Sequence, residues 1–196
     1  MSNNEDKKQE QDQMSFLEKS LKSRRIFLSE DVNSKSAKKI IDLLFLLESE
    51  DPNKPIYFFI NSPGGEVNSG LAIYDVMEFI SCPVYTIGCG LVASIAAIIH
   101  LQPQKDMRLS LPHAEYLLHQ PLGQMQGSAS ELEIHAKQIL KTRAELNQLI
   151  SDKSGQKLDV VAENTKRDFW MDAQESADWG LVGAIIRSSK ELPGLD

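Results

Sequence analysis

The chain has 196 residues, of which 41% are hydrophobic and 25% charged, a composition typical of a globular protein with one domain. Its formal net charge of −7 argues against DNA or RNA as the main partner, because phosphate binding requires clustered Lys and Arg. No apolar leader follows Met1, and no stretch approaches the roughly 20 apolar residues that span a bilayer. The two cysteines match neither a disulfide framework nor a zinc site. We therefore expect a cytoplasmic protein without a membrane anchor.

Segment 1–15 is polar and rich in Glu, Gln, Asp and Lys. Because it cannot bury enough apolar area to offset chain entropy, we expect it to be disordered or ordered only by a partner. One folded domain is predicted over 16–190, and 191–196 is predicted to be a C-terminal tail.

Helices and strands alternate along the first half of this domain. Apolar residues at helical spacing predict a helix over 36–48. The unbroken apolar run 56–60 predicts a strand that is covered on both faces, as in a parallel sheet, and Ser62-Pro63-Gly64-Gly65 ends it. The other predicted elements of this half are a helix over 67–81, a strand over 83–88 and a helix that starts near Ala93.

The second half is dominated by a long helical pattern over 130–153. Ser128 and Glu131 precede it at the spacing of a capping box. A second capped helix is predicted to begin after Asp172 and to end at Gly180. Repeated strand–turn–helix units predict an α/β fold with right-handed crossovers. The remaining predicted elements are strands over 109–111, 115–119 and 181–186 and a loop over 120–127.

Several kinds of chemistry lack their motifs in this sequence. It contains no Walker phosphate loop, no dinucleotide fingerprint and no His-Glu-x-x-His, and its four histidines have no metal-ligand spacing. We therefore expect neither a cofactor nor a metal. In open α/β sheets, functional sites gather at the carboxyl ends of strands. Gly64-Gly65, Ser94 and His119 each follow a predicted strand.

Each of these features has both a catalytic and a structural interpretation. Gly65 can direct an N–H toward an oxyanion, or the glycine pair can simply form a turn. Ser94 can be a nucleophile at a helix start or an ordinary N-cap. His119 can be a general base, and Asp168 can be its partner or a surface carboxylate. The residue types alone leave these alternatives open.

Taken in order, motifs between Arg24 and Ile186 resemble the ClpP family, the proteolytic subunits of the Clp protease. Each motif is modest, but their joint order and spacing are specific. They are Arg25-Ile26-Phe27-Leu28, Ile60-Asn61-Ser62-Pro63-Gly64-Gly65, Gly70-Leu71-Ala72-Ile73-Tyr74-Asp75, Ala93-Ser94, His119-Gln120-Pro121-Leu122-Gly123, Glu133-Ile134-His135-Ala136-Lys137-Gln138-Ile139-Leu140, Arg167-Asp168-Phe169-Trp170-Met171 and Ala177-Asp178-Trp179-Gly180-Leu181-Val182.

This resemblance implies a serine endopeptidase with a crotonase-like (ClpP-type) α/β fold of repeated βαβ units and a protruding handle helix. Carried over position by position, it places the nucleophile at Ser94, the base at His119 and the acid at Asp168. It places the oxyanion donors at the backbone N–H groups of Gly65 and Ile95.

The resemblance also implies an assembly of two stacked heptameric rings, homomeric or mixed, that degrades unfolded polypeptides in protein quality control. An AAA+ unfoldase of the Clp type would feed its chamber. The family's apolar docking pockets for the unfoldase correspond here to Tyr57, Phe59, Phe79 and Leu111, although these residues can equally be core residues.

One segment departs from the family pattern at the nucleophile, where the chain reads Gly90-Leu91-Val92-Ala93-Ser94-Ile95-Ala96. The added bulk keeps open the alternative of a catalytically weak or silent structural subunit in a mixed Clp complex. An acyl-CoA enzyme of the crotonase type would share the fold without needing a serine nucleophile. A membrane-bound signal-peptide peptidase is disfavoured because no anchor is predicted.

Overall fold

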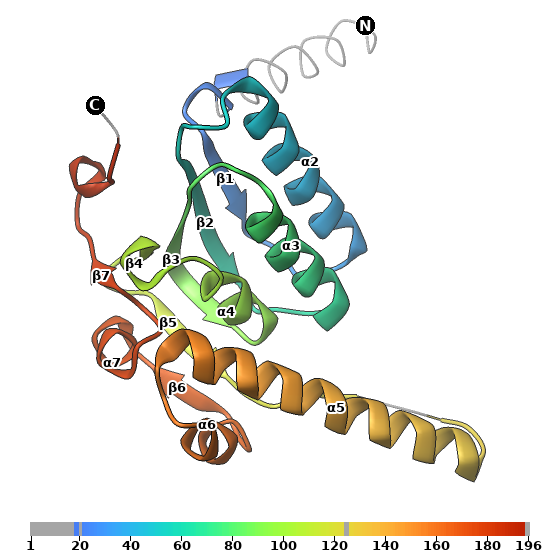
Figure 1. Ribbon diagram of the computed structural model, residues 1–196. Helices are drawn as coiled ribbons and strands as arrows, with labels where there is room; N and C mark the ends of the chain where they lie inside the picture. The colour runs from blue at the N-terminus through green and yellow to red at the C-terminus, as the bar shows by residue number, and fades with distance from the viewer. Residues whose placement is uncertain (1–17, 20, 124–125, 195–196) are drawn as a thin grey trace, which may run out of the picture.

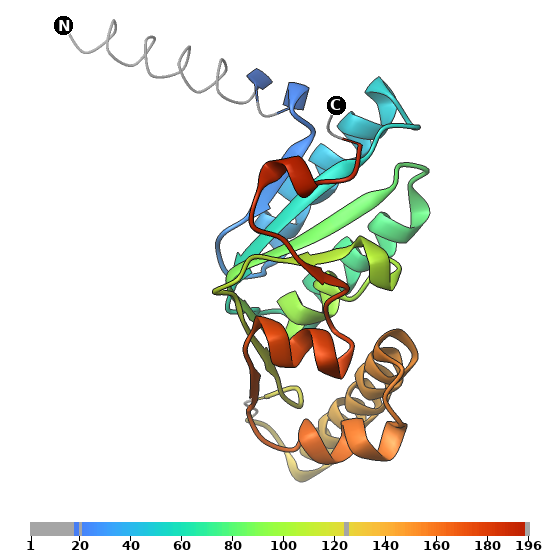
Figure 2. The same ribbon diagram turned by 90° about the vertical axis from the view of Figure 1, so that its left-hand side faces the viewer.

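The computed structural model describes residues 18–19, 21–123 and 126–194, which form one mixed α/β unit built on a seven-stranded sheet (Figure 1). Strands β1 (Arg25–Leu28), β2 (Ile56–Ser62) and β3 (Val84–Ala93) pair in parallel. Helices α2 (Ser34–Glu50) and α3 (Val67–Phe79) connect them and lie side by side on one face of the sheet (Figures 1 and 2). The predicted βαβ repeats are therefore confirmed.

Strand β3 is longer than the predicted 83–88 because it changes partners at Gly90. Its first half pairs with β2 and β4 (Arg108–Ser110). Beyond Gly90 it pairs with β5 (Glu115–Leu118) in place of β4, while Val92 still pairs with Ser62 of β2. Gly90 has φ +65°, and a Cβ there would lie 2.6 Å from Asn61 Oδ1. That oxygen accepts a hydrogen bond from Leu91 N–H at 3.0 Å, which stabilises the bend. The change of partner carries the end of β3 toward β5.

The second half of the chain lies around the other end of the sheet. Helix α5 (Ala129–Ser154) extends well beyond the sheet, as predicted for a handle helix (Figures 1 and 2). The Ser128 capping box begins it, and Gly155 in the left-handed conformation ends it. The other elements are α4 (Ile95–His100), α6 (Leu158–Asn164), β6 (Phe169–Met171), α7 (Ala173–Trp179), β7 (Ala184–Ile185) and the short 3₁₀ helices η1 (Lys105–Met107) and η2 (Ser189–Glu191).

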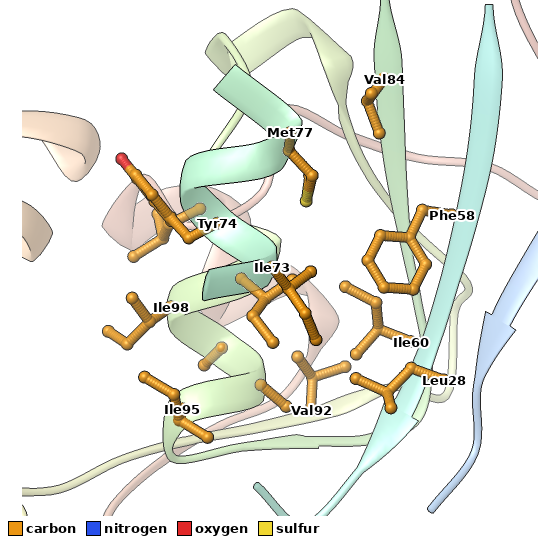
Figure 3. Packing of buried hydrophobic residues seen from close by; sticks show 14 of the residues in the cluster. Leu28, Phe58, Ile60, Ile73, Tyr74, Met77, Val84, Val92, Ile95 and Ile98 are labelled. Atoms are coloured by element: carbon orange, nitrogen blue, oxygen red, sulfur yellow. The ribbon is translucent and has the colours of Figure 1, made fainter. Parts of the chain in front are cut away.

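The main core lies between the sheet and helices α3 and α4 (Figure 3). Ile73 of α3 lies over Ile60 of β2, while Ile95 places the first turn of α4 in the same core. Ile73, Ile60 and Ile95 are at most 2% exposed. Burying a side chain of this size contributes about 1.5–3 kcal/mol. The residue that follows Ser94 is therefore anchored in the core.

Periodicity did not predict β1, α6 or β6, and the last strand, β7, is shorter than the predicted 181–186. The segment 1–15 lies outside the described residues. Leu192 packs against an apolar cluster and the Pro193 carbonyl accepts a hydrogen bond from Tyr57, so the chain stays on the body beyond residue 190. The boundaries at 16 and 190 stay predictions. No described helix is long and apolar enough to cross a bilayer.

Candidate active site

Ser94 occupies the sharp turn between β3 and α4. Its φ of 57° and ψ of −127° are rare for a residue with a side chain, and a backbone held in such a conformation costs about 1–3 kcal/mol. Its N–H donates to the Leu117 carbonyl of β5 at 2.8 Å. Although Ser94 stands at the N-cap position of α4, its side chain makes no capping hydrogen bond, so the capping interpretation is wrong. The hydroxyl is left available for another role.

His119 and Asp168 form a hydrogen-bonded pair at the ends of two neighbouring strands. Strands β5 and β6 are antiparallel, with Leu118 opposite Phe169, and this register places His119 opposite Asp168. The imidazole Nδ1 lies 3.2 Å from the carboxylate Oδ1. A carboxylate at Nδ1 favours the tautomer in which Nδ1 carries the proton and Nε2 is a free acceptor. This geometry would allow His119 to act as a general base that Asp168 orients.

Ser94 and His119 line the same small pocket. Within the part of the chain that the structure describes, the Ser94 hydroxyl makes no hydrogen bond to the imidazole. Catalytic hydrogen bonds are often long or misaligned before a substrate binds, so this arrangement is compatible with nucleophile and base. The rest of the pocket wall is mostly apolar and comprises Val67, Ile95, Ile98, Leu118, Pro121, Leu146, Asn147 and Ile150.

The glycine turn packs directly against the turn of Ser94. A Cβ on Gly64, whose φ is +92°, would lie 2.7 Å from the Ser94 Cβ. Val32 binds the residues on either side of Gly65, because its N–H donates to the Gly64 carbonyl and its carbonyl accepts from Glu66 N–H, both at 2.8 Å. This bridge pattern directs the N–H of Gly65 away from Val32.

The two predicted oxyanion donors are both available. Among the described residues, neither Gly65 N–H nor Ile95 N–H donates to a protein acceptor. Ile95 is the first residue of α4, where backbone N–H groups have no intrahelical partner. Two free N–H groups flanking a strained serine can stabilise an anion that forms on a bound carbonyl.

The four residues predicted to form docking pockets for the unfoldase lie in two separate regions of the subunit. Tyr57 is buried, and it forms a second apolar cluster with the half-buried Phe59 and Leu111. Phe79 lies outside this cluster at the end of α3, where it is 78% exposed and meets Phe45 edge-on at a centroid distance of 6.3 Å. Only Phe79 of the four is thus freely accessible on a single subunit.

The remaining histidines lie away from the site. His113 and His135 are exposed. His100 is fully buried beside Tyr116, and desolvation together with the nearby Arg108 cation lowers its pKa to about 3. The described residues contain no group of three side chains that could hold a metal ion. Sequence reasoning missed Asn147, whose only available signal was its position on the predicted long helix.

Comparison with known proteins gave consistent matches along nearly the whole chain. The family model described as Clp protease matches residues 7–189. The ATP-dependent Clp protease proteolytic subunit 2 of Treponema pallidum is 46% identical over 178 residues, which cover 91% of this chain and 89% of that protein. The protein of the same name from Treponema denticola is 44% identical over 191 residues, covering 97% and 96%. The ATP-dependent Clp protease proteolytic subunit of Ligilactobacillus salivarius is 44% identical over 172 residues, covering 88% and 87%.

Proposed function

This chain belongs to the Clp protease family, and we propose that it is a serine endopeptidase subunit in which Ser94 attacks peptide carbonyls. The observation that carries the proposal is the strained turn at Ser94, which leaves the hydroxyl uncapped in the pocket that His119 also lines. Such strain in a turn between a strand and a helix is typical of functional residues. The relatives are named as proteolytic subunits, which disfavours the alternative of a silent structural subunit.

In the proposed reaction, Ser94 Oγ bonds to the carbonyl carbon while its proton passes to Nε2 of His119. The resulting oxyanion accepts hydrogen bonds from the N–H groups of Gly65 and Ile95. His119 then protonates the leaving amine as the C–N bond breaks, and Asp168 stabilises the imidazolium throughout. Water then attacks the acyl carbon while His119 takes its proton, and His119 returns that proton to Ser94 Oγ as the acyl–oxygen bond breaks. Each oxyanion donor of this kind typically contributes about 100- to 1,000-fold in rate.

The apolar surface of α5 supports assembly with further copies of the chain. Leu132, Ile134 and Leu140 are exposed along this projecting helix. Large apolar side chains left exposed on more than one side of a helix that projects from the body favour its contact with other protein surfaces. We propose that α5 packs between two stacked seven-membered rings of a cytoplasmic assembly that acts in protein quality control, where unfolded chains are cleaved inside the chamber. Mass measurement of the native assembly tests this stoichiometry and whether the rings are uniform.

An AAA+ unfoldase of the Clp type is the proposed partner. The relatives carry the words "ATP-dependent" in their names, whereas this chain has no phosphate-binding loop of its own. The exposed Phe79 is the strongest of the four proposed docking residues, while Tyr57, Phe59 and Leu111 would contribute through the cluster they form.

A fluorophosphonate probe tests the nucleophile directly. The full-length protein is expected to be labelled at Ser94, and Ser94→Ala is expected to abolish the labelling. Continued labelling of the alanine variant would eliminate Ser94 as the nucleophile. Thioester hydrolysis by Ser94→Ala at the wild-type rate would instead favour an acyl-CoA enzyme of the crotonase type.

A further inference from the structure

Gln120 follows His119 directly and binds the turn that carries Asp168. Its backbone N–H donates to the Thr165 carbonyl at 2.7 Å, and its side-chain Nε2 donates to the Lys166 carbonyl at 2.9 Å. The side-chain amide of Gln120 supplies a second donor beside its backbone N–H, so that two successive carbonyls of the turn are held from one residue.

The Asp168 carboxylate needs such support because it is exposed. Its side chain is 62% accessible in the subunit, against 19% for His119. An exposed charge pair contributes little to holding two groups in one geometry, because water screens it and side-chain entropy opposes it. Among the described residues, His119 provides the one hydrogen bond recorded for the Asp168 side chain. The position of the carboxylate must therefore come mainly from its backbone.

That backbone is anchored at Thr165 before Asp168 and at strand β6 after it, and between them the Lys166 N–H makes a long hydrogen bond, to the Glu163 carbonyl at 3.3 Å. The Thr165 side chain is buried. Its hydroxyl lies 2.9 Å from the Val161 carbonyl oxygen and 3.0 Å from Asn147 Oδ1, and both oxygens can accept its hydrogen bond. Phe169 begins strand β6 and is paired with β5. Lys166 lies between these anchors and is exposed, and the Gln120 amide holds its carbonyl.

We propose that Gln120 is a positioning residue for the charge pair, in which its side-chain amide keeps the Asp168 carboxylate within hydrogen-bond distance of His119 Nδ1. This inference rests on the proposed function, because it assigns Gln120 a role in the same reaction. Gln120 acts through the turn and touches neither the substrate nor the reacting atoms. Loss of its amide donor would let the carboxylate drift, and a misplacement of about 1 Å in a catalytic group can cost about 100-fold in rate.

The orientation of the Gln120 amide is supported from its other end. Its Oε1 accepts a hydrogen bond from Arg143 Nη1 of helix α5 at 3.3 Å. Arginine offers only donors, so the oxygen must face Arg143 and the nitrogen must face the Lys166 carbonyl. Gln120→Glu would keep the acceptor for Arg143 and lose the donor to Lys166, whereas Gln120→Met would lose both at nearly constant volume.

The test measures labelling of the full-length protein by a fluorophosphonate, with kinact separated from KI. Gln120→Met and Gln120→Glu should each lower kinact by about 10- to 100-fold and leave KI unchanged, because orientation of the base affects the chemical step rather than binding. Gln148→Met is the matched control, since Gln148 donates to Asp152 on the exposed face of α5 outside the site, and it should retain the wild-type kinact. A variant that merely misfolds would lower the labelled fraction instead.

Hydrogen–deuterium exchange provides a second measurement that does not depend on activity. The peptide covering 165–171 should exchange faster in both Gln120 variants and at the wild-type rate in Gln148→Met. A wild-type kinact in both Gln120 variants overturns the proposal, and so does a lowered kinact with unchanged exchange of this peptide. If the Ser94→Ala variant is still labelled, the proposed function is wrong. The exchange of peptide 165–171 then tests the effect of Gln120 on the turn by itself, and unchanged exchange in the Gln120 variants would refute that effect.

Discussion

Replacing Gly64 by alanine should disturb the turn of Ser94 more than it disturbs the rest of the fold. A Cβ at position 64 would lie 2.6 Å from the Ala93 carbonyl oxygen, 2.7 Å from the Ser94 Cβ and 3.2 Å from the Ile95 nitrogen. These neighbours are backbone atoms or a Cβ, so none can rotate away as the end of a flexible side chain could. The segment 93–95 would have to move as a whole.

Gly155 provides a matched control for the backbone conformation. It has φ +78°, compared with +92° for Gly64, but a Cβ at position 155 would meet no atom within 4 Å. A left-handed conformation costs a residue with a side chain about 1–2 kcal/mol, and overpacking adds about 1–3 kcal/mol. We therefore expect Gly155→Ala to lower the free energy of unfolding by about 1–2 kcal/mol, and Gly64→Ala to lower it by about 2–5 kcal/mol.

Thermal unfolding and fluorophosphonate labelling together test this reasoning. For a chain of this size, each kcal/mol lowers the melting temperature by about 2–4 °C. Measurements at one protein concentration are needed because assembly also stabilises the fold. Gly64→Ala should lose labelling by about 100- to 1,000-fold, as if one oxyanion donor were displaced, while Gly155→Ala retains it. Wild-type labelling of Gly64→Ala, or an equal loss in Gly155→Ala, would refute the coupling between the two turns.

Two further predictions concern buried groups outside the site. His100 has a pKa lowered to about 3 by desolvation and by Arg108, so the folded state stays neutral while the unfolded chain binds a proton below about pH 6.5. As the pH falls from about 6.5 to about 3, the free energy of unfolding should therefore decrease by up to about 1.4 kcal/mol per pH unit. Denaturant titrations at several pH values should show a flatter dependence for His100→Leu, and the same pH dependence in the variant and the wild type would contradict the prediction. Arg24 donates to four carbonyls around the end of α2, so Arg24→Lys should lower the free energy of unfolding by about 2–4 kcal/mol, whereas the exposed Arg187→Lys should leave it unchanged.

The elements with strong local signals were predicted well from the sequence. The helix predicted over 67–81 is α3 at Val67–Phe79, and the helix predicted over 130–153 is α5 at Ala129–Ser154. Both predicted capping boxes form, at Ser128 and at Asp172. These signals are local because caps and helical periodicity involve residues three or four positions apart.

The parts of the site that depend on distant pairing were not visible in local patterns. Strand β6 has three residues, too few for periodicity to detect, yet its pairing with β5 brings Asp168 to His119 across 49 residues of sequence. At Ser94 the sequence favours an N-cap, and nothing local indicates the positive φ that turns the hydroxyl out of the cap. For these residues, the resemblance to the ClpP family carried the prediction, and the pattern of residue types did not.

The bend at Gly90 explains why this fold can bring such distant segments together. If β3 continued to pair with β4 to its end, the Ser94 turn would have no contact with the strand that leads to His119. Because β3 changes partner, Ser94 N–H can donate to the Leu117 carbonyl, two residues before His119. One side of the Ser94 turn then meets Gly64, and the other side is joined by backbone to the charge pair. The relative positions of Ser94, the Gly65 and Ile95 N–H groups and His119 are thus set largely by main-chain contacts, which change less with side-chain identity than side-chain packing does.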